Sequence, residues 1–229
     1  MNITPSTLTR AAGVAAVAAG LIFIGVQINH PHLDATSIST TEMAVRNSLK
    51  LLMAVFALAG ITGMYVHQVK QMGVLGLVGY LLFAANYLVI MSTTFAAAYV
   101  LPSVAATDPS YVNDVLAAQT GGHATGDIGL LQTVIAVEGA LFLAGGLVFG
   151  IALYRARVLT RWAAALLAVG GVVTAALTVM PDAFYRLLAF PNSVAMIALG
   201  YSLWSAARPV TTTHATAADT PLLTPAGAE

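Results

Sequence analysis

Cysteine is absent from the 229 residues of this chain. Disulfide bonds, thiolate metal sites, cysteine nucleophiles and iron–sulfur clusters are therefore all excluded, whichever compartment the loops face. Charge is scarce as well, because Asp, Glu, Lys and Arg make up only 8% of the chain, against about 25% in soluble domains. The 9 basic and 9 acidic side chains cancel to a formal net charge of zero. This composition excludes a basic nucleic-acid-binding surface and a disordered polyelectrolyte, so nucleic acid is not a predicted partner.

Apolar residues make up 59% of the chain, and 20 glycines add to them. A soluble domain reaches only about 45–50% when glycine is included in the count. Strand-like alternation is missing, whereas long apolar runs recur. A run of about 20 residues is what an α-helix needs to cross a hydrocarbon core of ~30 Å. The sequence therefore predicts an all-α, polytopic integral membrane protein.

Six apolar runs of suitable length are bounded by charged, proline or polar residues. They are Ala11–Ile28, Leu49–Val66, Val74–Leu101, Leu130–Tyr154, Trp162–Met180 and Leu187–Ala207. We expect residues 1–208 to form a single six-helix transmembrane domain. Residues 209–229 are rich in Thr, Ala and Pro and poor in large apolar groups. This composition predicts a disordered tail.

The distribution of Lys and Arg predicts the orientation, because these charges near span ends resist translocation. With the N-terminus inside, six basic residues lie at cytoplasmic ends and three at the opposite ends. The cytoplasmic set is Arg10, Lys70, Arg155, Arg157, Arg161 and Arg208, and the outer set is Arg46, Lys50 and Arg186. We therefore expect a multi-pass protein of the cell membrane with both termini, and hence the tail, in the cytoplasm.

The longest loop, residues 102–128, is expected outside and holds three aspartates but neither Lys nor Arg. Asp108 followed by Pro109 is typical of a helix N-terminus. Apolar residues then recur at helical spacing from Tyr111 to Leu116, until Gly121 ends the run. The pattern predicts a short amphipathic helix at about 108–120 on the outer membrane surface, either as a connector or as a lid.

Glu138 is the acidic residue that lies well inside an expected span, which makes it a candidate for function. It lies about 12 Å along the helix from the start of the span. Phe142, Gly145 and Phe149 share its helix face. A carboxyl group in hydrocarbon favours its neutral form, so Glu138 is suited to donate or carry a proton or to anchor a headgroup. The alternative is a structural glutamate that hydrogen-bonds to a neighbouring span.

The third span carries the other deep polar residue, Asn86, for which interhelical hydrogen bonding is the ordinary role. Tyr80, Phe83 and Tyr87 lie on a neighbouring face of the same helix, and such stripes commonly serve packing. Spans three and four are joined by one outer loop and are expected to be adjacent. The candidate ligand-binding residues on these two spans are Asn86, Tyr87, Phe142 and Phe149.

No cofactor or metal site is predicted. His30 and His32 are a permissible pair of metal ligands, but the sequence contains no helical His-x-x-x-His or Glu-x-x-His pattern, and Pro31 separates the two histidines. The glycine-rich segment from Gly73 to Gly79 opens a membrane span without a preceding strand, which argues against a nucleotide site.

The segment from Gly150 to Trp162 reads GIALYRARVLTRW. It resembles the junction between the fourth and fifth spans of bacterial six-span membrane families of unknown function. Those families carry Leu-Pro-Arg at this junction, and here Thr160 replaces the proline. The resemblance covers most of residues 8–207 and implies a six-span fold, but no catalytic residue.

A weaker resemblance is to small integral-membrane terpene cyclases, which are similar in length, all helical and rich in aromatic residues. The resemblance implies that acidic side chains protonate an alkene or epoxide while aromatic faces stabilise the cation. Glu138 would be the proton donor beside Phe142 and Phe149, and Asp182 would be the second acid. That family has seven spans and more than one essential acid, whereas this sequence predicts six spans and one deep acid.

Three functions remain open on the sequence alone. The first is a membrane protein that holds a lipid or another apolar small molecule in its helical bundle, with Glu138 in the pocket. The second is a terpene cyclase that acts by proton donation, with Glu138 and Asp182 as catalytic residues. The third is a small-molecule or proton-coupled transporter. The expected partner is a membrane lipid or another apolar small molecule, and protein partners stay unknown.

Overall fold

The computed structural model describes residues 4–173 and 189–207. Every regular element within these ranges is a helix, so the all-α prediction is confirmed there. The elements are α1 (Pro5–Gln27), η1 (Ser37–Ser39), α2 (Thr41–His67), α3 (Val69–Tyr99), α4 (Leu101–Ala105), α5 (Pro109–Gln119), α6 (Leu130–Ala156), α7 (Arg161–Val173) and α9 (Ala189–Ala206). Asp182 and the tail expected at 209–229 lie outside the described residues.

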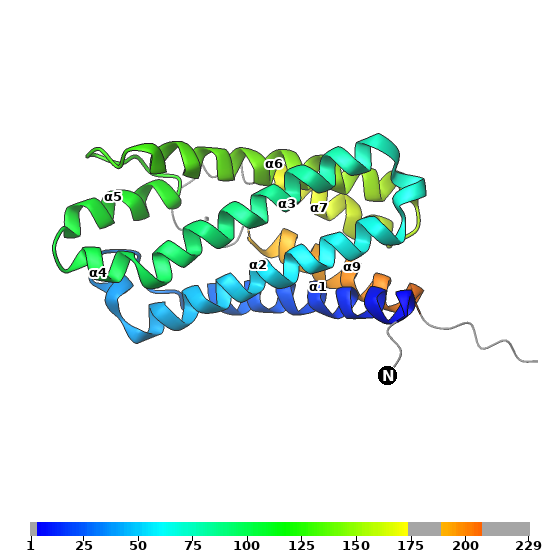
Figure 1. Ribbon diagram of the computed structural model, residues 1–229, viewed down its shortest axis with the longest axis horizontal. Coiled ribbons are helices and arrows are strands. Elements are labelled where there is room, and N and C mark those ends of the chain that lie inside the picture. Colours follow the sequence, from blue (N-terminus) through cyan, green and yellow to red (C-terminus); the bar gives the residue numbers. More distant parts are fainter. Residues whose placement is uncertain (1–3, 174–188, 208–229) are drawn as a thin grey trace, which may run out of the picture.

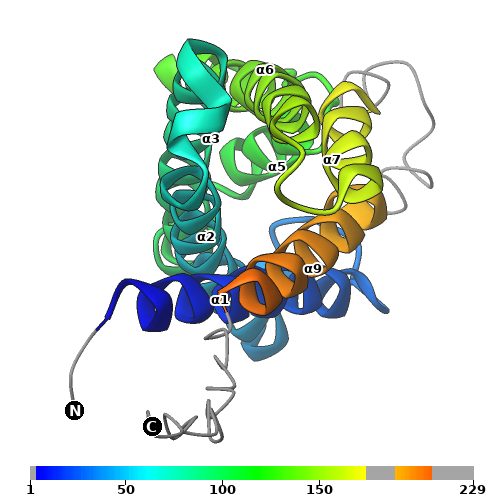
Figure 2. The same cartoon turned by 90° about the vertical axis from the view of Figure 1, so that its right-hand side faces the viewer.

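The long helices form a closed ring. Its order is α1, α2, α3, α6, α7, α9 and back to α1, and each helix packs mainly against its two neighbours in the ring (Figure 2). Neighbouring helices are antiparallel, as the contacts of α1 with α9 illustrate: Gly13 lies against Gly200, whereas Gly20, further along α1, lies against Ser193. The start of α1 and the end of α9 therefore share one end of the bundle, and α5 lies at the other end (Figure 1).

Four helices, α1, α2, α3 and α6, are long and apolar enough to cross a membrane. They correspond to the first four expected spans. The fifth expected span is described only as far as Val173 in α7, and the sixth corresponds to the 18 residues of α9. A helical bundle with several candidate spans is thus established, while the count of six and the cytoplasmic termini stay predictions.

Two helix boundaries differ from the expected span limits. α2 begins at Thr41 rather than at Leu49, because the Thr40 side chain accepts a hydrogen bond from the Met43 amide and caps the helix there. α3 begins at Val69 but is interrupted at Gly73, whose φ of 56° is a conformation that favours glycine. The expected limits differ because hydropathy identifies only the part of a helix that lies in the hydrocarbon core of a membrane. The first residue of the helix is determined by capping.

The buried apolar side chains form two clusters. The larger one fills the ring and includes Met53, Phe83, Phe149, Leu167 and Met196. The smaller one lies at the end that carries α5, and it joins η1, α2, α4 and α5 through side chains such as Ile38, Met43, Leu101, Val112 and Leu116.

The helix expected at about 108–120 is present as α5, and the Asp108 side chain accepts a hydrogen bond from the Tyr111 amide at 3.0 Å. Its apolar face was expected to lie on the membrane surface. In the structure, Val112, Val115 and Leu116 of this face are buried against the protein, because η1 and α4 present a matching apolar surface. The position of the helix relative to a membrane stays a prediction. α5 therefore covers one end of the bundle as part of a second small core.

Candidate functional site

The candidate residues on spans three and four meet at the contact between α3 and α6, which are neighbours as expected. The two backbones approach closely at two glycines. A Cβ atom added to Gly145 would lie 2.7 Å from the backbone of Phe83, and one added to Gly79 would lie 2.6 Å from the backbone nitrogen of Phe149. Small residues permit this close approach, and these two contacts fix the antiparallel register of the pair.

Phe83 is the centre of an aromatic cluster on this contact. Its ring centroid lies 4.9 Å from that of Tyr87, 5.9 Å from that of Phe142 and 6.2 Å from that of Phe149. The Phe142 ring meets Phe83 nearly edge to face, at 76°, which is a favoured geometry for aromatic pairs. Three of the predicted ligand-binding residues, Tyr87, Phe142 and Phe149, are thus brought together.

Tyr80 does not join this cluster, although it belongs to the same sequence stripe as Phe83 and Tyr87. Its ring stacks on Tyr65 of α2 with centroids 4.7 Å apart, and its hydroxyl lies 3.1 Å from the Thr62 hydroxyl. The aromatic residues of α3 are therefore divided between two helix contacts, because α2 packs on one side of α3 and α6 on the other.

Two buried asparagines hold amide groups without hydrogen-bond partners. Asn86 on α3 is 0% exposed and Asn192 on α9 is 2% exposed. Neither the amide oxygen nor the amide nitrogen of either residue is hydrogen-bonded within the described part of the chain. The interhelical hydrogen bond expected for Asn86 is therefore not formed there. Buried polar side-chain atoms are usually paired, so four unpaired atoms in an apolar interior are exceptional.

Asn192 was not among the residues that the sequence singled out. The signal that could have found it is an amide inside an apolar run, directly after Pro191, in the sixth expected span. The buried Tyr87 hydroxyl approaches the Asn192 side chain without forming a hydrogen bond of regular geometry. Tyr87 thereby links the aromatic cluster on α3 to the amide on α9.

Glu138 is hydrogen-bonded to the neighbouring helix. The Thr93 hydroxyl on α3 lies 2.8 Å from Oε2 of Glu138, and also 3.2 Å from the carbonyl oxygens of Val89 and Ile90. A hydroxyl has one proton, so Thr93 donates either to a carboxylate or to a backbone carbonyl. In the second case a neutral Glu138 donates its proton to Thr93. The contact accommodates both protonation states.

Glu138 and Asn86 lie at different levels of the bundle. Thr93, the partner of Glu138, follows Asn86 by seven residues, which corresponds to about 10 Å along the helix. In the register set by the glycine contacts, Asn86 is instead level with Phe142. The two polar residues thus mark separate positions along one helix contact. Asp182, the expected second acid, lies outside the described residues.

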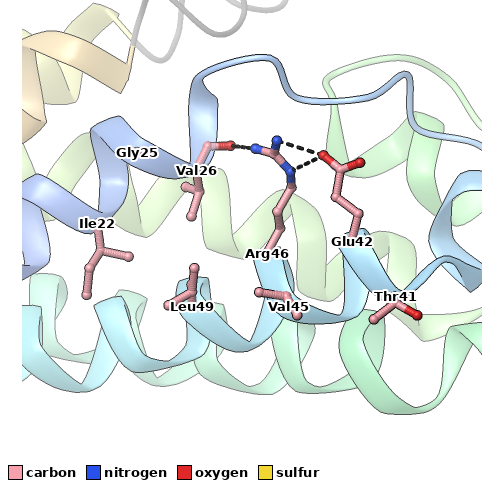
Figure 3. Close-up of a pocket in the computed structure, with 8 residues that line it drawn as sticks. All are labelled: Ile22, Gly25, Val26, Thr41, Glu42, Val45, Arg46 and Leu49. Atoms are coloured by element: carbon pink, nitrogen blue, oxygen red, sulfur yellow. Dashed lines mark hydrogen bonds and ion pairs between the residues drawn. The ribbon is translucent and has the colours of Figure 1, made fainter.

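A separate groove of about 450 Å³ lies between α1 and α2, and Figure 3 shows the residues that line it. Arg46 lies at one side of this groove, where its side chain pairs with Glu42 at 2.7 Å. The same guanidinium donates to the carbonyl oxygens of Val26, Ile28 and Asn29 at 3.0–3.1 Å. Arg46 therefore caps the end of α1, and its donors are engaged within the protein rather than presented to the groove.

His30 and His32, in the loop between α1 and η1, have other neighbours than a set of metal ligands. The His30 ring lies 2.9 Å from the Pro31 carbonyl oxygen and 3.1 Å from the Lys50 ammonium, while His32 lies 3.6 Å from Asp34. No group of three potential metal ligands occurs within residues 4–173 and 189–207.

Comparisons of the chain with protein-family models, with curated proteins and with solved structures found no match.

Proposed function

We propose that this protein is an integral membrane protein whose helical ring binds an apolar small molecule that carries a hydrogen-bonding group. Membrane lipids and isoprenoid compounds belong to this class. Four helices with the length and hydropathy of membrane spans support the membrane location. The pair of unpartnered buried asparagines is the observation that carries the binding proposal.

The energetic argument starts from the cost of an unpaired amide. A buried donor or acceptor without a partner costs about 1–3 kcal/mol, and the cost is avoided by an apolar side chain of similar shape. Asn86 and Asn192 each offer a donor and an acceptor, so a hydroxyl, carbonyl or amide group of a ligand satisfies them. Binding then recovers the free-energy cost of the unpaired amide groups.

The apolar part of the ligand is matched by the surroundings of the two amides. Phe142 supplies aromatic surface at the level of Asn86, and Phe83 and Phe149 continue this surface along the contact between α3 and α6. Tyr87 extends it towards Asn192. Small-molecule sites commonly combine such apolar walls with a few polar groups that fix the orientation of the ligand.

The experiment compares the substitutions Asn86→Leu and Asn192→Leu with the wild-type protein. Native mass spectrometry after mild extraction identifies small molecules that leave the membrane with the protein. Thermal unfolding with and without added lipids and prenyl alcohols then measures binding. For either substitution we expect unchanged or higher stability without ligand, together with a loss of about tenfold in ligand affinity.

Asn47→Leu is the matched control. Asn47 is also buried, but its side chain donates to the carbonyl oxygen of Ala97 at 3.4 Å. Its substitution is expected to lower stability without changing ligand affinity. A wild-type protein that emerges empty, and whose stability no lipid or prenyl compound alters, would falsify the binding proposal. Ordered internal water on the two amides would then be the remaining partner.

An acid-initiated cyclase is a second candidate, favoured by the contact between Glu138 and Thr93 one helical turn from Phe142. Such an enzyme needs a protonated donor held away from water and close to aromatic faces. Membranes that contain the protein are supplied with linear farnesyl and geranylgeranyl compounds, free or attached to an aromatic group. Cyclised products that disappear in Glu138→Gln support this candidate, and Asp182→Asn tests the second acid.

The same Glu138→Gln variant tests proton-coupled transport. Uptake into vesicles that depends on a proton gradient and is lost in this variant would assign Glu138 as a proton carrier. Unchanged folding of the variant is the control, since glutamine retains the size of the side chain and can still bond to Thr93.

A further inference from the structure

Charged side chains of the described residues are distributed unevenly between the two ends of the bundle, although Arg46 and Lys50 lie at the end that carries α5 and Glu138 lies between the ends. The end where α1 begins, here called the basic end, carries Arg10, Lys70, Arg155, Arg157 and Arg161. No acidic side chain of residues 4–173 or 189–207 lies at this end. The opposite end holds five acids, namely Asp34, Glu42, Asp108, Asp114 and Asp127. The basic end is therefore suited to an anionic surface or ligand.

Three of these cations lie within seven residues at the turn from α6 to α7. Arg155, Arg157 and Arg161 are all exposed. Arg155 and Arg157 make no hydrogen bond or ion pair with any described residue, so their donors are available. Arg157 ends α6 in the left-handed conformation, with φ of 57°, where glycine is the usual residue. Arginine is strained in this backbone conformation, where glycine would not be, but it places a positive charge at the end of α6.

An apolar groove of about 210 Å³ begins directly beside this turn, between α6 and α7. It is lined by Gly150, Ile151, Tyr154, Ala165 and Ala168. Tyr154 connects the groove with the arginines, because its ring lines the groove and also carries the Arg161 guanidinium, 4.3 Å from the ring centroid. A cation is thus held at the end of an apolar groove on the outside of the ring.

We propose that this groove and turn form a binding site for a phospholipid with an anionic headgroup. One acyl chain lies in the groove, and the phosphate is held by Arg155, Arg157 and Arg161. Charge complementarity selects this occupant, since the cations lack acidic partners and arginine matches phosphate oxygens with several N–H donors. Basic sites between membrane helices are suited to such headgroups. The inference rests on the proposed membrane insertion, but not on the ligand of the ring interior.

The test uses the full chain in vesicles of phosphatidylcholine, alone or mixed with an equal part of phosphatidylglycerol. Lipids that remain bound after mild extraction are counted by native mass spectrometry. Arg155→Gln and Arg157→Gln are each expected to lower the preference for phosphatidylglycerol about fivefold. Each leaves four of the five described cations at the basic end, so the orientation signal is largely retained.

Two matched controls separate a defined site from general charge. Lys70→Gln removes one exposed cation from the same end, at the start of α3. Ala165→Leu fills the groove without changing charge, whereas Ala136→Leu adds the same atoms to an exposed position of α6 outside it. We expect Ala165→Leu to lower lipid retention, and Lys70→Gln and Ala136→Leu to leave it unchanged.

The results of these experiments distinguish a defined lipid site from attraction by diffuse charge and from a failure of membrane insertion. An equal loss of preference in Lys70→Gln and Arg157→Gln means that diffuse surface charge attracts the lipid, and this overturns the site. A wild-type chain that stays integral to the vesicles during alkaline extraction, yet shows no headgroup preference, also overturns it while leaving membrane insertion intact. Release of the chain by alkaline extraction would instead overturn membrane insertion, and the lipid site with it.

Discussion

Thr93 and Glu138 connect α3 with α6 through a side-chain hydrogen bond of 2.8 Å. The bond lies on the same helix contact as the Phe83 cluster but further towards the end that carries α5. Glu138 therefore has a defined partner in the protein. Protonation of Glu138 would reverse the direction of this hydrogen bond, because a neutral carboxyl group donates where a carboxylate accepts.

The contribution of this bond to stability is expected to be modest. Thr93→Val removes the hydroxyl and retains the shape, and side-chain hydrogen bonds between membrane helices contribute about 0.6 kcal/mol on average and up to about 1.7. We expect the free energy of unfolding in detergent to fall within that range, and Thr93→Ser to restore most of it. In a double-mutant cycle with Glu138→Leu, a coupling energy of zero would show that the bond contributes nothing.

Gly145→Ala is expected to weaken the contact between α3 and α6. The added Cβ would lie 2.7 Å from backbone atoms of Phe83, which cannot move aside as a flexible side chain can. Overpacking of this kind costs about 1–3 kcal/mol. Gly139→Ala on the same helix is the control, because its Cβ meets no atom within 4 Å and alanine favours the helix. Similar unfolding temperatures for both variants would contradict the close approach.

Arg46→Gln is expected to release the end of α1. The variant loses charged hydrogen bonds to three carbonyl groups, and one such bond contributes about 1.5–3 kcal/mol. Hydrogen exchange should rise at residues 26–30, and Arg46→Lys should not restore protection, because an ammonium does not reproduce the guanidinium fork. Glu42→Gln, which alters only the exposed ion pair, should change exchange little.

The segment that follows α5 is expected to loosen at acid pH. Hydrogen bonds from the Thr125 amide and hydroxyl and from the Gly126 amide hold the pKa of Asp114 below its ordinary value of 3.8. A lowered pKa in the folded state means that the carboxylate stabilises the fold above the ordinary pKa. That stabilisation is lost as the pH falls through the lowered value. Hydrogen exchange at residues 121–129, corrected for intrinsic rates, should therefore rise below about pH 4.

Asp114→Asn should reproduce this loosening at neutral pH, because the uncharged amide turns a donor towards the same backbone donors. Asp127→Asn is the control, since Asp127 accepts only from the Gly129 amide within its own turn. Equal exchange in the two variants at pH 7 would show that Asp114 does not hold the segment.

Cysteine accessibility tests the membrane topology on this cysteine-free background. Ser110→Cys places a thiol on α5, and Val158→Cys places one in the turn between α6 and α7, at the opposite end of the bundle (Figure 1). A membrane-impermeant maleimide should label the first from outside and the second only from the cytoplasmic side. Labelling of both thiols from one side would show that α6 does not cross the membrane.

The local features of the protein follow from the sequence alone. Runs of apolar residues near 20 in length predicted α1, α2, α3 and α6, because hydrophobic length and helical hydrogen bonding are properties of a single segment. Asp108 and Pro109 predicted the start of α5 for the same reason, since capping involves residues within one turn. The face shared by Glu138 and Phe142 followed from helical periodicity.

Ring closure decided the features that depend on partners distant in the chain. In the closed ring, Tyr80 stacks on Tyr65 of α2, whereas Tyr87 lies near Asn192 of α9. Glu138 of α6 is hydrogen-bonded to Thr93 of α3. Helical periodicity assigns a residue to a face, but only packing determines which neighbour that face meets and whether a polar atom there finds a partner. The unpaired amides of Asn86 and Asn192 therefore became visible in the tertiary structure, because the absence of a hydrogen bond depends on every helix around it.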